Sequence, residues 1–212
     1  MNNIFHCGIF RYLLLIQILN GSNNAKSTSL LSLGISKSYA INPINTNRLY
    51  IQSGMSFKSL PGNNNYQYYP DIGFGYKVSK NLVLEGSVFN HSLGGFSDQI
   101  IRGGVQYYFG SSDTLSWVSS LKKVNYKSIK NFNLNNITLE ISKWIKYRNN
   151  FFRFGLGSNF YKKDNFLYKQ RGQINFILLN TIIPVKFFQL SFETRMNLDM
   201  FFYSFSFLKD FY

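Results

Sequence analysis

The end of the chain, residues 199–212, reads DMFFYSFSFLKDFY. Aromatic residues occupy every second position from Phe201 to Phe207, and Ser204 and Ser206 lie between them. Because successive side chains of a β-strand point to opposite faces, this alternation predicts a strand with one aromatic face. The aromatic positions of this predicted final strand are Phe201, Tyr203, Phe205, Phe207 and Phe211.

The same alternation recurs along the chain in segments of about ten residues, each bounded by turn residues. The clearest example is residues 71–79, in which Ile72, Phe74 and Tyr76 alternate with glycine, aspartate and lysine. The sequence therefore predicts a series of half-apolar strands. The other predicted strands are residues 29–39, 49–58, 82–89, 101–109, 115–122, 137–146, 152–161, 172–183 and 188–197.

The predicted connections alternate in length. Short turns are expected near residues 79–81, 110–113, 147–150 and 184–185, and longer loops at 60–70, 90–98, 123–136 and 162–171. Residues 49–211 give ten strands. Adding residues 29–39 and 10–19 gives twelve, although residues 10–19 lack a polar face. The sequence favours twelve slightly and leaves the count open between ten and twelve.

Composition agrees with an all-β fold. The chain is 45% hydrophobic and 18% aromatic and has only 4 prolines, and aromatic residues suit pleated surfaces. The sequence contains no run of about 18 apolar residues, so it predicts no membrane-spanning helix. The net charge is +14. Nucleic-acid binding is nevertheless not expected, because the sequence has no basic helix, zinc spacing or RNA-binding aromatic motif.

The repeated alternating segments and the aromatic final strand together resemble bacterial outer-membrane β-barrel proteins. The resemblance covers residues 28–212 and names no individual family. It implies a closed antiparallel transmembrane barrel with short periplasmic turns and longer extracellular loops, in the outer membrane of a Gram-negative bacterium. In that family the terminal strand also serves as a signal for the barrel assembly machinery, so the five aromatic residues above would carry that signal.

The polar face of the segments decides between a membrane barrel and a soluble fold. Glycine, serine, amide and charged residues could not fill a dry core, because unpaired buried charges cost several kcal/mol each. The apolar face is therefore expected to meet lipid, and the alternative is a soluble β-sandwich. Interfacial aromatic girdles are predicted at Tyr39, Tyr76, Phe109, Trp117 and Phe160.

Charged residues on the inward face are predicted to form an ion-pair network in the lumen. The structural interpretation is a network that plugs a narrow barrel, and the functional alternative is a constriction that selects ions or small solutes. Arginine suits bidentate pairing with carboxylates. The predicted members are Glu85, Arg102, Glu140, Arg153, Glu193 and Arg195.

Residues 1–27 are predicted to be a signal peptide or an N-terminal extension, because Arg11 precedes a short apolar run. Cys7 is the single cysteine, so no internal disulfide can form.

Basic residues in two predicted loops make lipopolysaccharide a candidate partner, and the alternative is a solvated rim. They are Lys122, Lys123, Lys127 and Lys130 in one loop and Lys162, Lys163, Lys169 and Arg171 in the other.

Catalysis is the least favoured function. His6 lies in the predicted signal peptide, and His91 lies at the mouth of a predicted loop beside Ser92, with Asp98 nearby. No catalytic motif matches there, and the sequence predicts no metal or cofactor site. The expected protein is thus a structural or surface-interaction barrel, with a narrow channel as the first alternative and an outer-membrane hydrolase or acyltransferase as the second.

Overall fold

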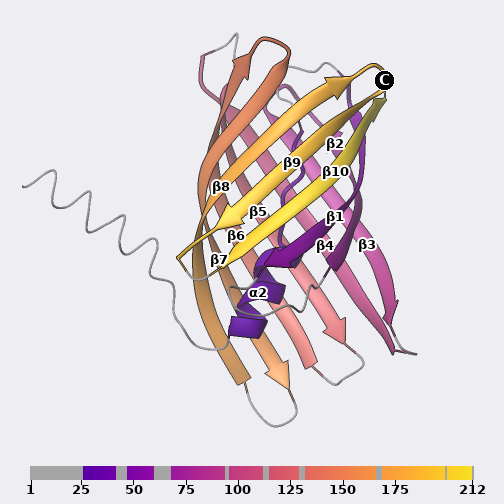
Figure 1. The fold of residues 1–212 in the computed structure, drawn as a ribbon, viewed down its shortest axis with the longest axis vertical. Helices are drawn as coiled ribbons and strands as arrows, with labels where there is room; N and C mark the ends of the chain where they lie inside the picture. The colour runs from indigo at the N-terminus through magenta and orange to yellow at the C-terminus, as the bar shows by residue number, and fades with distance from the viewer. Residues whose placement is uncertain are drawn as a thin grey trace, which may run out of the picture.

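The computed structural model describes residues 26–41, 47–59, 68–93, 96–111, 115–128, 132–165, 169–198 and 200–211. Within these residues ten antiparallel strands close into one barrel (Figure 1). The strands are β1 (Leu49–Ser59), β2 (Tyr68–Lys77), β3 (Leu82–Leu93), β4 (Phe96–Phe109), β5 (Trp117–Ser128), β6 (Phe132–Tyr147), β7 (Asn150–Asn165), β8 (Lys169–Val185), β9 (Phe188–Met196) and β10 (Phe201–Phe211).

Each strand pairs with its sequence neighbours, and β1 pairs with β10 from Leu49↔Phe211 to Ser59↔Phe201 to close the ring. The all-β fold and the closed antiparallel barrel are confirmed. Because the ring closes, the backbone N–H and C=O groups of the first and last strands bond to each other. No additional strand can therefore enter between them. Of the two strand counts that the sequence left open, ten and twelve, the described residues form ten, so the slight preference for twelve is wrong.

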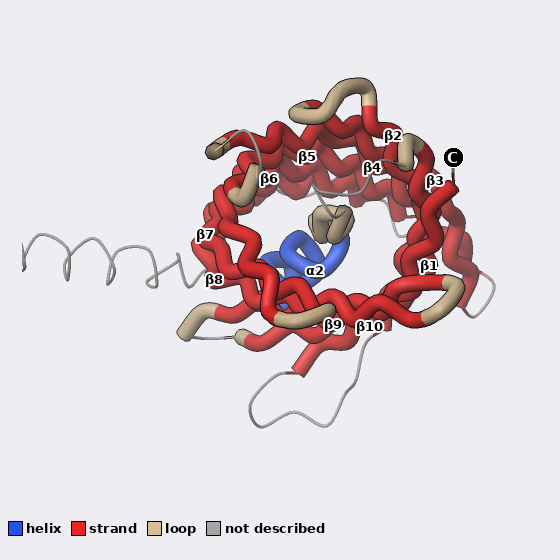
Figure 2. Tube along the Cα trace, turned by 90° about the horizontal axis from the view of Figure 1, so that it is seen from above, coloured by secondary structure: helices blue, strands red, loops and turns tan. Residues whose placement is uncertain are grey.

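The predicted strand at residues 29–39 is also wrong. Residues Lys26–Ile35 form a helix, α2, and residues 36–41 continue as extended chain. Figure 2 shows α2 inside the ring of strands. Leu33 and Ile35, which the alternation assigned to a lipid-facing side, are buried against the inner wall. The candidate strand at residues 10–19 lies outside the described residues.

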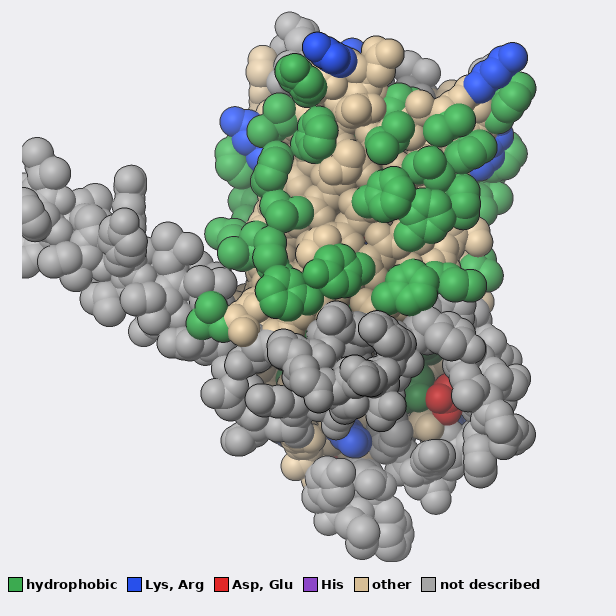
Figure 3. Space-filling model, in the orientation of Figure 1, with side chains coloured by type: hydrophobic (Ala, Val, Ile, Leu, Met, Phe, Trp, Pro, Cys, Tyr) green, Lys and Arg blue, Asp and Glu red, His purple; other side chains and the backbone are tan. Residues whose placement is uncertain are grey.

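The strands alternate between an apolar outer face and a polar inner face. In β5 every second residue is buried over the whole strand. Outward side chains such as Phe74 and Val88 are 54% and 67% exposed, whereas inward Arg153 and Arg195 are almost fully buried. Figure 3 shows hydrophobic side chains spread over the outside of the barrel wall. Among the residues described, no helix has the length and apolar character needed to cross a membrane.

The two ends of the barrel differ. The C-terminal strand ends at the same end of the barrel as the tight turns at residues 148–149 and 186–187, and this end is called the terminal end. At the opposite end, β6, β7 and β8 project as strands of 16, 16 and 17 residues, longer than the 9–11 that span a bilayer. The predicted loops at 90–98, 123–136 and 162–171 are therefore largely strand, and only short connections separate the paired strands there.

Candidate functional site: the charged lumen and the segment inside it

Four charged side chains form a cluster inside the barrel, called the arginine cluster. The Arg153 guanidinium lies 2.8 Å from Glu193 and 3.6 Å from Glu140. The Arg195 guanidinium lies 2.9 Å from Glu193 and 3.2 Å from Glu140. Asn180 donates a further hydrogen bond to Glu193 at 3.1 Å. Two guanidinium groups thus balance two carboxylates at positions from β6, β7 and β9.

A second cluster lies around Asp71 of β2 and is called the aspartate cluster. The Asp71 carboxylate accepts from Arg102 at 2.5 Å and from the Gln52 amide at 2.8 Å. Lys37, which belongs to the segment inside the lumen, lies 3.2 Å from the same carboxylate and donates to Ser206 at 2.8 Å. All three charged groups are buried. The wall therefore binds a cation of the enclosed segment.

Glu85 forms a third buried pair, with Lys122 at 2.8 Å. Lys122 was predicted in a basic surface loop, and this prediction is wrong: it lies on the inward face of β5, 1% exposed. The Glu85 carboxylate also accepts from the Gln106 amide and from the backbone N–H of Tyr39. Glu85 therefore joins two strands of the wall to the segment in the lumen.

The structure thus places all six sequence-predicted lumen residues inside the barrel and divides them among these groups. Glu140, Arg153, Glu193 and Arg195 come together, whereas Glu85 and Arg102 pair with groups that the sequence reasoning did not select. Those missed groups are Asp71, Lys122 and Lys37. Asp71 and Lys122 occupy inward positions of their alternating strands, so a strict count of the alternation could have found both.

The enclosed segment, residues 26–41, begins with α2 and is called the lumen segment. Side chains of the wall donate to its backbone carbonyls, and its own side chains bond the wall as well. Ser29 contacts the Tyr161 hydroxyl at 2.9 Å, and Ser38 contacts Ser120 at 3.4 Å. The carbonyl acceptors, each with its wall donor, are Ser32 (Asn136, 3.1 Å), Ser36 (Arg195, 3.1 Å), Lys37 (Lys122), Tyr39 (Gln106, 2.8 Å) and Ile41 (Tyr108, 3.0 Å).

Glycines of β2 make room for this segment. A Cβ at Gly73 would lie 1.6 Å from the Tyr39 hydroxyl, and a Cβ at Gly75 would lie 2.4 Å from Ile41 Cδ1. Tyr39, predicted in an interfacial girdle, is instead buried in the lumen, 2% exposed. The girdle prediction is wrong there because Tyr39 does not belong to a strand of the wall.

The outer face carries the other predicted aromatic residues. Tyr76, Trp117 and Phe160 are 43%, 38% and 41% exposed, and the ring of Phe109 stacks on those of Tyr107 and Trp117. In the final strand, Phe201, Tyr203, Phe207 and Phe211 are exposed on the outside, and the Phe205 ring packs against Phe192 and Phe207.

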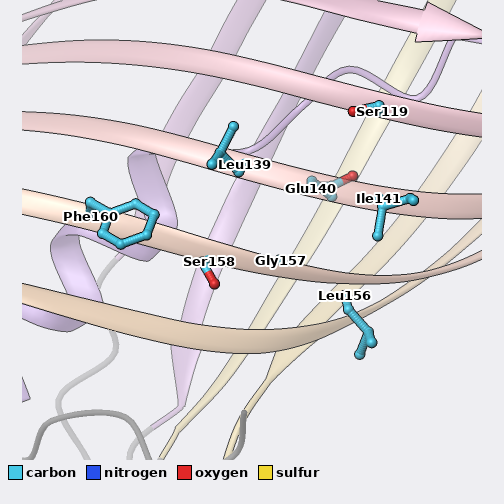
Figure 4. Close-up of a pocket in the computed structure, with 8 residues that line it drawn as sticks. All are labelled: Ser119, Leu139, Glu140, Ile141, Leu156, Gly157, Ser158 and Phe160. Carbon is cyan, nitrogen blue, oxygen red and sulfur yellow. The ribbon is translucent and has the colours of Figure 1, made fainter. Parts of the chain in front are cut away.

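The outer face also carries a hollow of about 440 Å³ over β5, β6 and β7. Its lining includes Ser119 and Ser158 and larger apolar side chains such as Leu139 and Phe160 (Figure 4). Its lining contains no histidine, cysteine or lysine.

The candidate catalytic position differs from its prediction. His91 lies within β3 opposite Asp98 of β4, rather than in a loop, and its side chain is outside the described part of the structure. The Asp98 carboxylate accepts from the hydroxyls of Tyr126 at 2.5 Å and Ser128 at 2.8 Å. Among the described residues, no group of three or more His, Cys, Asp or Glu side chains could hold a metal ion.

The closed barrel, its apolar outer face and its polar lumen define the class of this protein: an integral β-barrel membrane protein of the bacterial outer-membrane type. No family model matches the sequence, and no curated protein matches it significantly.

Three solved structures match this chain at low identity and with TM-scores below 0.5. A bacterial polysaccharide outer membrane secretin matches with a TM-score of 0.44 and 9% identity over 79% of this chain and 77% of that chain. Ail, the attachment invasion locus protein of Yersinia pestis, has a TM-score of 0.30 and 10% identity over 77% and 97%. OmpT, an outer membrane protein of Vibrio cholerae, has a TM-score of 0.34 and 8% identity over 79% of this chain and 62% of that chain. These likenesses concern the fold alone.

Proposed function

We propose that this protein is a structural or surface-interaction barrel of the outer membrane whose lumen is closed by its own chain. The observation that carries the proposal is the lumen segment, whose side chains from Ser32 to Ile41 are all buried against the wall. The arginine cluster contacts this segment at the Ser36 carbonyl, and the aspartate cluster contacts it at Lys37. A barrel of ten strands is far narrower than the 16–18 strands of open porins.

Planar-bilayer recording tests this proposal. The purified protein is expected to show no large, steady conductance. A variant that lacks residues 26–41, shown to be folded by its heat-modifiable mobility on gels, is the matched control and is expected to conduct. Large, steady conductance of the unaltered protein would contradict the proposal.

A narrow channel for ions or small solutes is the second candidate. It is favoured by the charge balance of the wall: without Lys37, the aspartate cluster and the Glu85 pair together hold two acids and two bases, and the arginine cluster is also balanced. Clusters that are balanced without the lumen segment could stay folded and wet when that segment moves. Conductance that begins only after a voltage step would support this candidate.

A hydrolase or acyltransferase is the remaining alternative, and His91 is its candidate base. Purified protein and the His91→Ala variant can be compared for hydrolysis of phospholipid and of peptide. Equal, background-level rates are expected, and a rate that falls in the variant would establish the enzyme.

The barrel assembly machinery is proposed as a partner because the outward positions of β10 are aromatic from Phe201 to Phe207 and again at Phe211, with Lys209 between. In reconstituted vesicles with the machinery, Phe211→Ala should fold several-fold more slowly. Phe187→Ala, in the turn at the same end of the barrel, is the control and should fold at the normal rate. Equal rates for both variants would argue against the signal.

Lipopolysaccharide is proposed as a surface partner through basic residues of the projecting strands. Two residues drop out of the predicted set: Lys122 pairs with Glu85 in the lumen, and Lys163 contacts Thr28 of the lumen segment at 3.3 Å. Lys130 lies outside the described residues. The remaining outward side chains lie just beyond the apolar wall, where glycolipid phosphates would be: Lys123, Lys127, Lys162, Lys169 and Arg171. Reversing their charge should lower retention of lipopolysaccharide during purification, whereas charge reversal at Lys146, near the terminal end, should not.

A further inference from the structure

The extended part of the lumen segment is held in the way that a sheet holds a strand. Lys37, Tyr39 and Ile41 are alternate residues, and the carbonyl oxygen of each accepts a hydrogen bond from the wall. The backbone N–H of Tyr39 donates to Glu85 at 2.9 Å. Carbonyls of alternate residues in an extended chain point to the same side, so one side of this backbone is satisfied along its length.

The groups that hold it are side chains rather than a neighbouring strand. Gln106 and Tyr108 of β4 and Lys122 of β5 donate to the three carbonyls. When an extended peptide binds by adding a strand to a sheet, hydrogen bonds to its main chain supply affinity, and pockets for its alternate side chains supply selectivity. The lumen supplies both, because Tyr39 lies over Gly73 and Ile41 over Gly75. The lumen is thus shaped for an extended polypeptide.

The segment also has a direction along the barrel. Its first residues contact β7 near the end of that strand, where Thr28 meets Lys163. Its last described residue, Ile41, meets Tyr108 near the end of β4, at the terminal end of the barrel. Figure 1 agrees, because α2 lies in the half of the barrel away from the C-terminus. The chain therefore runs through the lumen from the projecting end to the terminal end, and β1 begins there.

The outer surface indicates which end faces the cell exterior. Beyond the apolar wall, one register row across β5 to β8 reads Asn125, Asn135, Lys162 and Arg171 on the outward side. Strands that continue past the bilayer in polar form belong to the extracellular end, and tight turns belong to the periplasmic end. The first turn of α2 therefore faces the exterior.

We infer that the lumen is a polypeptide-binding conduit that carries this protein's own chain outward, so that the residues preceding Lys26 are presented on the outer side of the membrane. The inference rests on the proposed membrane barrel. It takes the residues before α2 as an N-terminal extension, the second of the two alternatives given above, and adds a display role to the barrel, because that extension would be anchored at the surface by the barrel.

Tag accessibility tests the direction. An epitope tag is inserted between residues 25 and 26 of the full chain, and antibody is added to intact and to permeabilised cells. One control tag lies after Leu198, in the connection at the projecting end, and another at Arg148, in a tight turn of the terminal end. The tags at 25 and 198 are expected to be labelled on intact cells, and the tag at 148 only after permeabilisation. If the tag at 25 behaves like the tag at 148, the inference is overturned.

A disulfide tests the path through the lumen. Ser38 Oγ lies 3.4 Å from Ser120 Oγ, so Ser38→Cys with Ser120→Cys should cross-link when oxidised, in a background in which Cys7→Ser removes the native thiol. Ser119 is exposed on the lipid-facing side of the same strand, and Ser38→Cys with Ser119→Cys should not cross-link. A folded barrel without the 38–120 cross-link would overturn the inference.

These outcomes separate the inference from the proposed function. Low conductance with a periplasmic tag at residue 25 would keep the closed barrel and remove the display role. High conductance with a surface-labelled tag at residue 25 would remove the closed barrel and keep the display role.

Discussion

Removal of Arg153 from the arginine cluster is expected to destabilise the folded barrel strongly. Its guanidinium is fully buried and contacts Glu193 at 2.8 Å and Glu140 at 3.6 Å. In Arg153→Met, which keeps much of the volume, two buried carboxylates share Arg195 alone. Removing one partner of a buried ion pair typically costs about 3–5 kcal/mol, because the other charge stays buried without compensation.

Urea unfolding in lipid vesicles measures this change. The folded fraction can be read as the fraction that keeps its heat-modifiable mobility, which avoids the fluorescence of Trp144, whose ring lies 5.4 Å from the Arg153 guanidinium. With a slope of about 2 kcal/mol per molar urea, a loss of about 3–5 kcal/mol lowers the midpoint by about 1.5–2.5 M.

The matched control restores the balance of charge. Arg153→Met with Glu140→Gln leaves one carboxylate, Glu193, and one guanidinium, Arg195, at 2.9 Å. This double variant is expected to be more stable than Arg153→Met alone, with a coupling of at least about 1 kcal/mol. A midpoint for Arg153→Met within about 0.5 M of the unaltered protein, equivalent to about 1 kcal/mol, would refute the reasoning. A double variant that loses the sum of both single effects would also refute it.

Two further predictions concern the lumen segment and the outer face. Gly75→Ala should lower stability by about 1–3 kcal/mol through overpacking, because its Cβ would lie 2.4 Å from Ile41 Cδ1. Adding Ile41→Val removes that atom and should restore most of the loss in urea unfolding, and no rescue would place the segment elsewhere. Ile141→Arg, on the lipid-facing side at 47% exposure, should cost about 2–4 kcal/mol in vesicles. The control Asn133→Arg, outward on the projecting part of β6, should cost less than about 1 kcal/mol, and equal effects would contradict the placement of the bilayer.

The strands and their faces follow from the sequence because the alternation is set by side chains that meet lipid or lumen. Where strands leave the bilayer, the alternation of apolar and polar side chains ends, although the backbone hydrogen bonding between the strands continues. In the projecting parts of β5 and β6, outward Lys123, Asn125 and Asn135 look like loop residues, yet backbone hydrogen bonds extend these strands. Backbone pairing does not depend on outward side chains, so the predicted loops were too long.

The lumen segment could not be predicted from alternation. Leu31, Leu33 and Ile35 alternate as a strand would, but β1 and β10 already pair with each other over their whole length. Which segment closes a barrel is a property of the complete ring and not of one stretch of sequence. The same error hid Lys37 as a partner of Asp71, because a strand of the wall would have placed its side chain toward lipid.

The width of the barrel explains why the wall and the lumen segment need each other. Eight strands leave an interior that side chains can fill, and 16–18 strands leave a water channel. Ten strands lined largely by serine, glycine and asparagine leave a space between these limits. A single polypeptide fills that space. Three of the charged side chains that pair with one another in the lumen, Glu85, Lys122 and Arg195, also bond to its backbone. The segment can therefore consist of small residues such as Ser36, Ser38 and Ala40 and still be held along its length, which a plug made of side-chain ion pairs alone would not achieve.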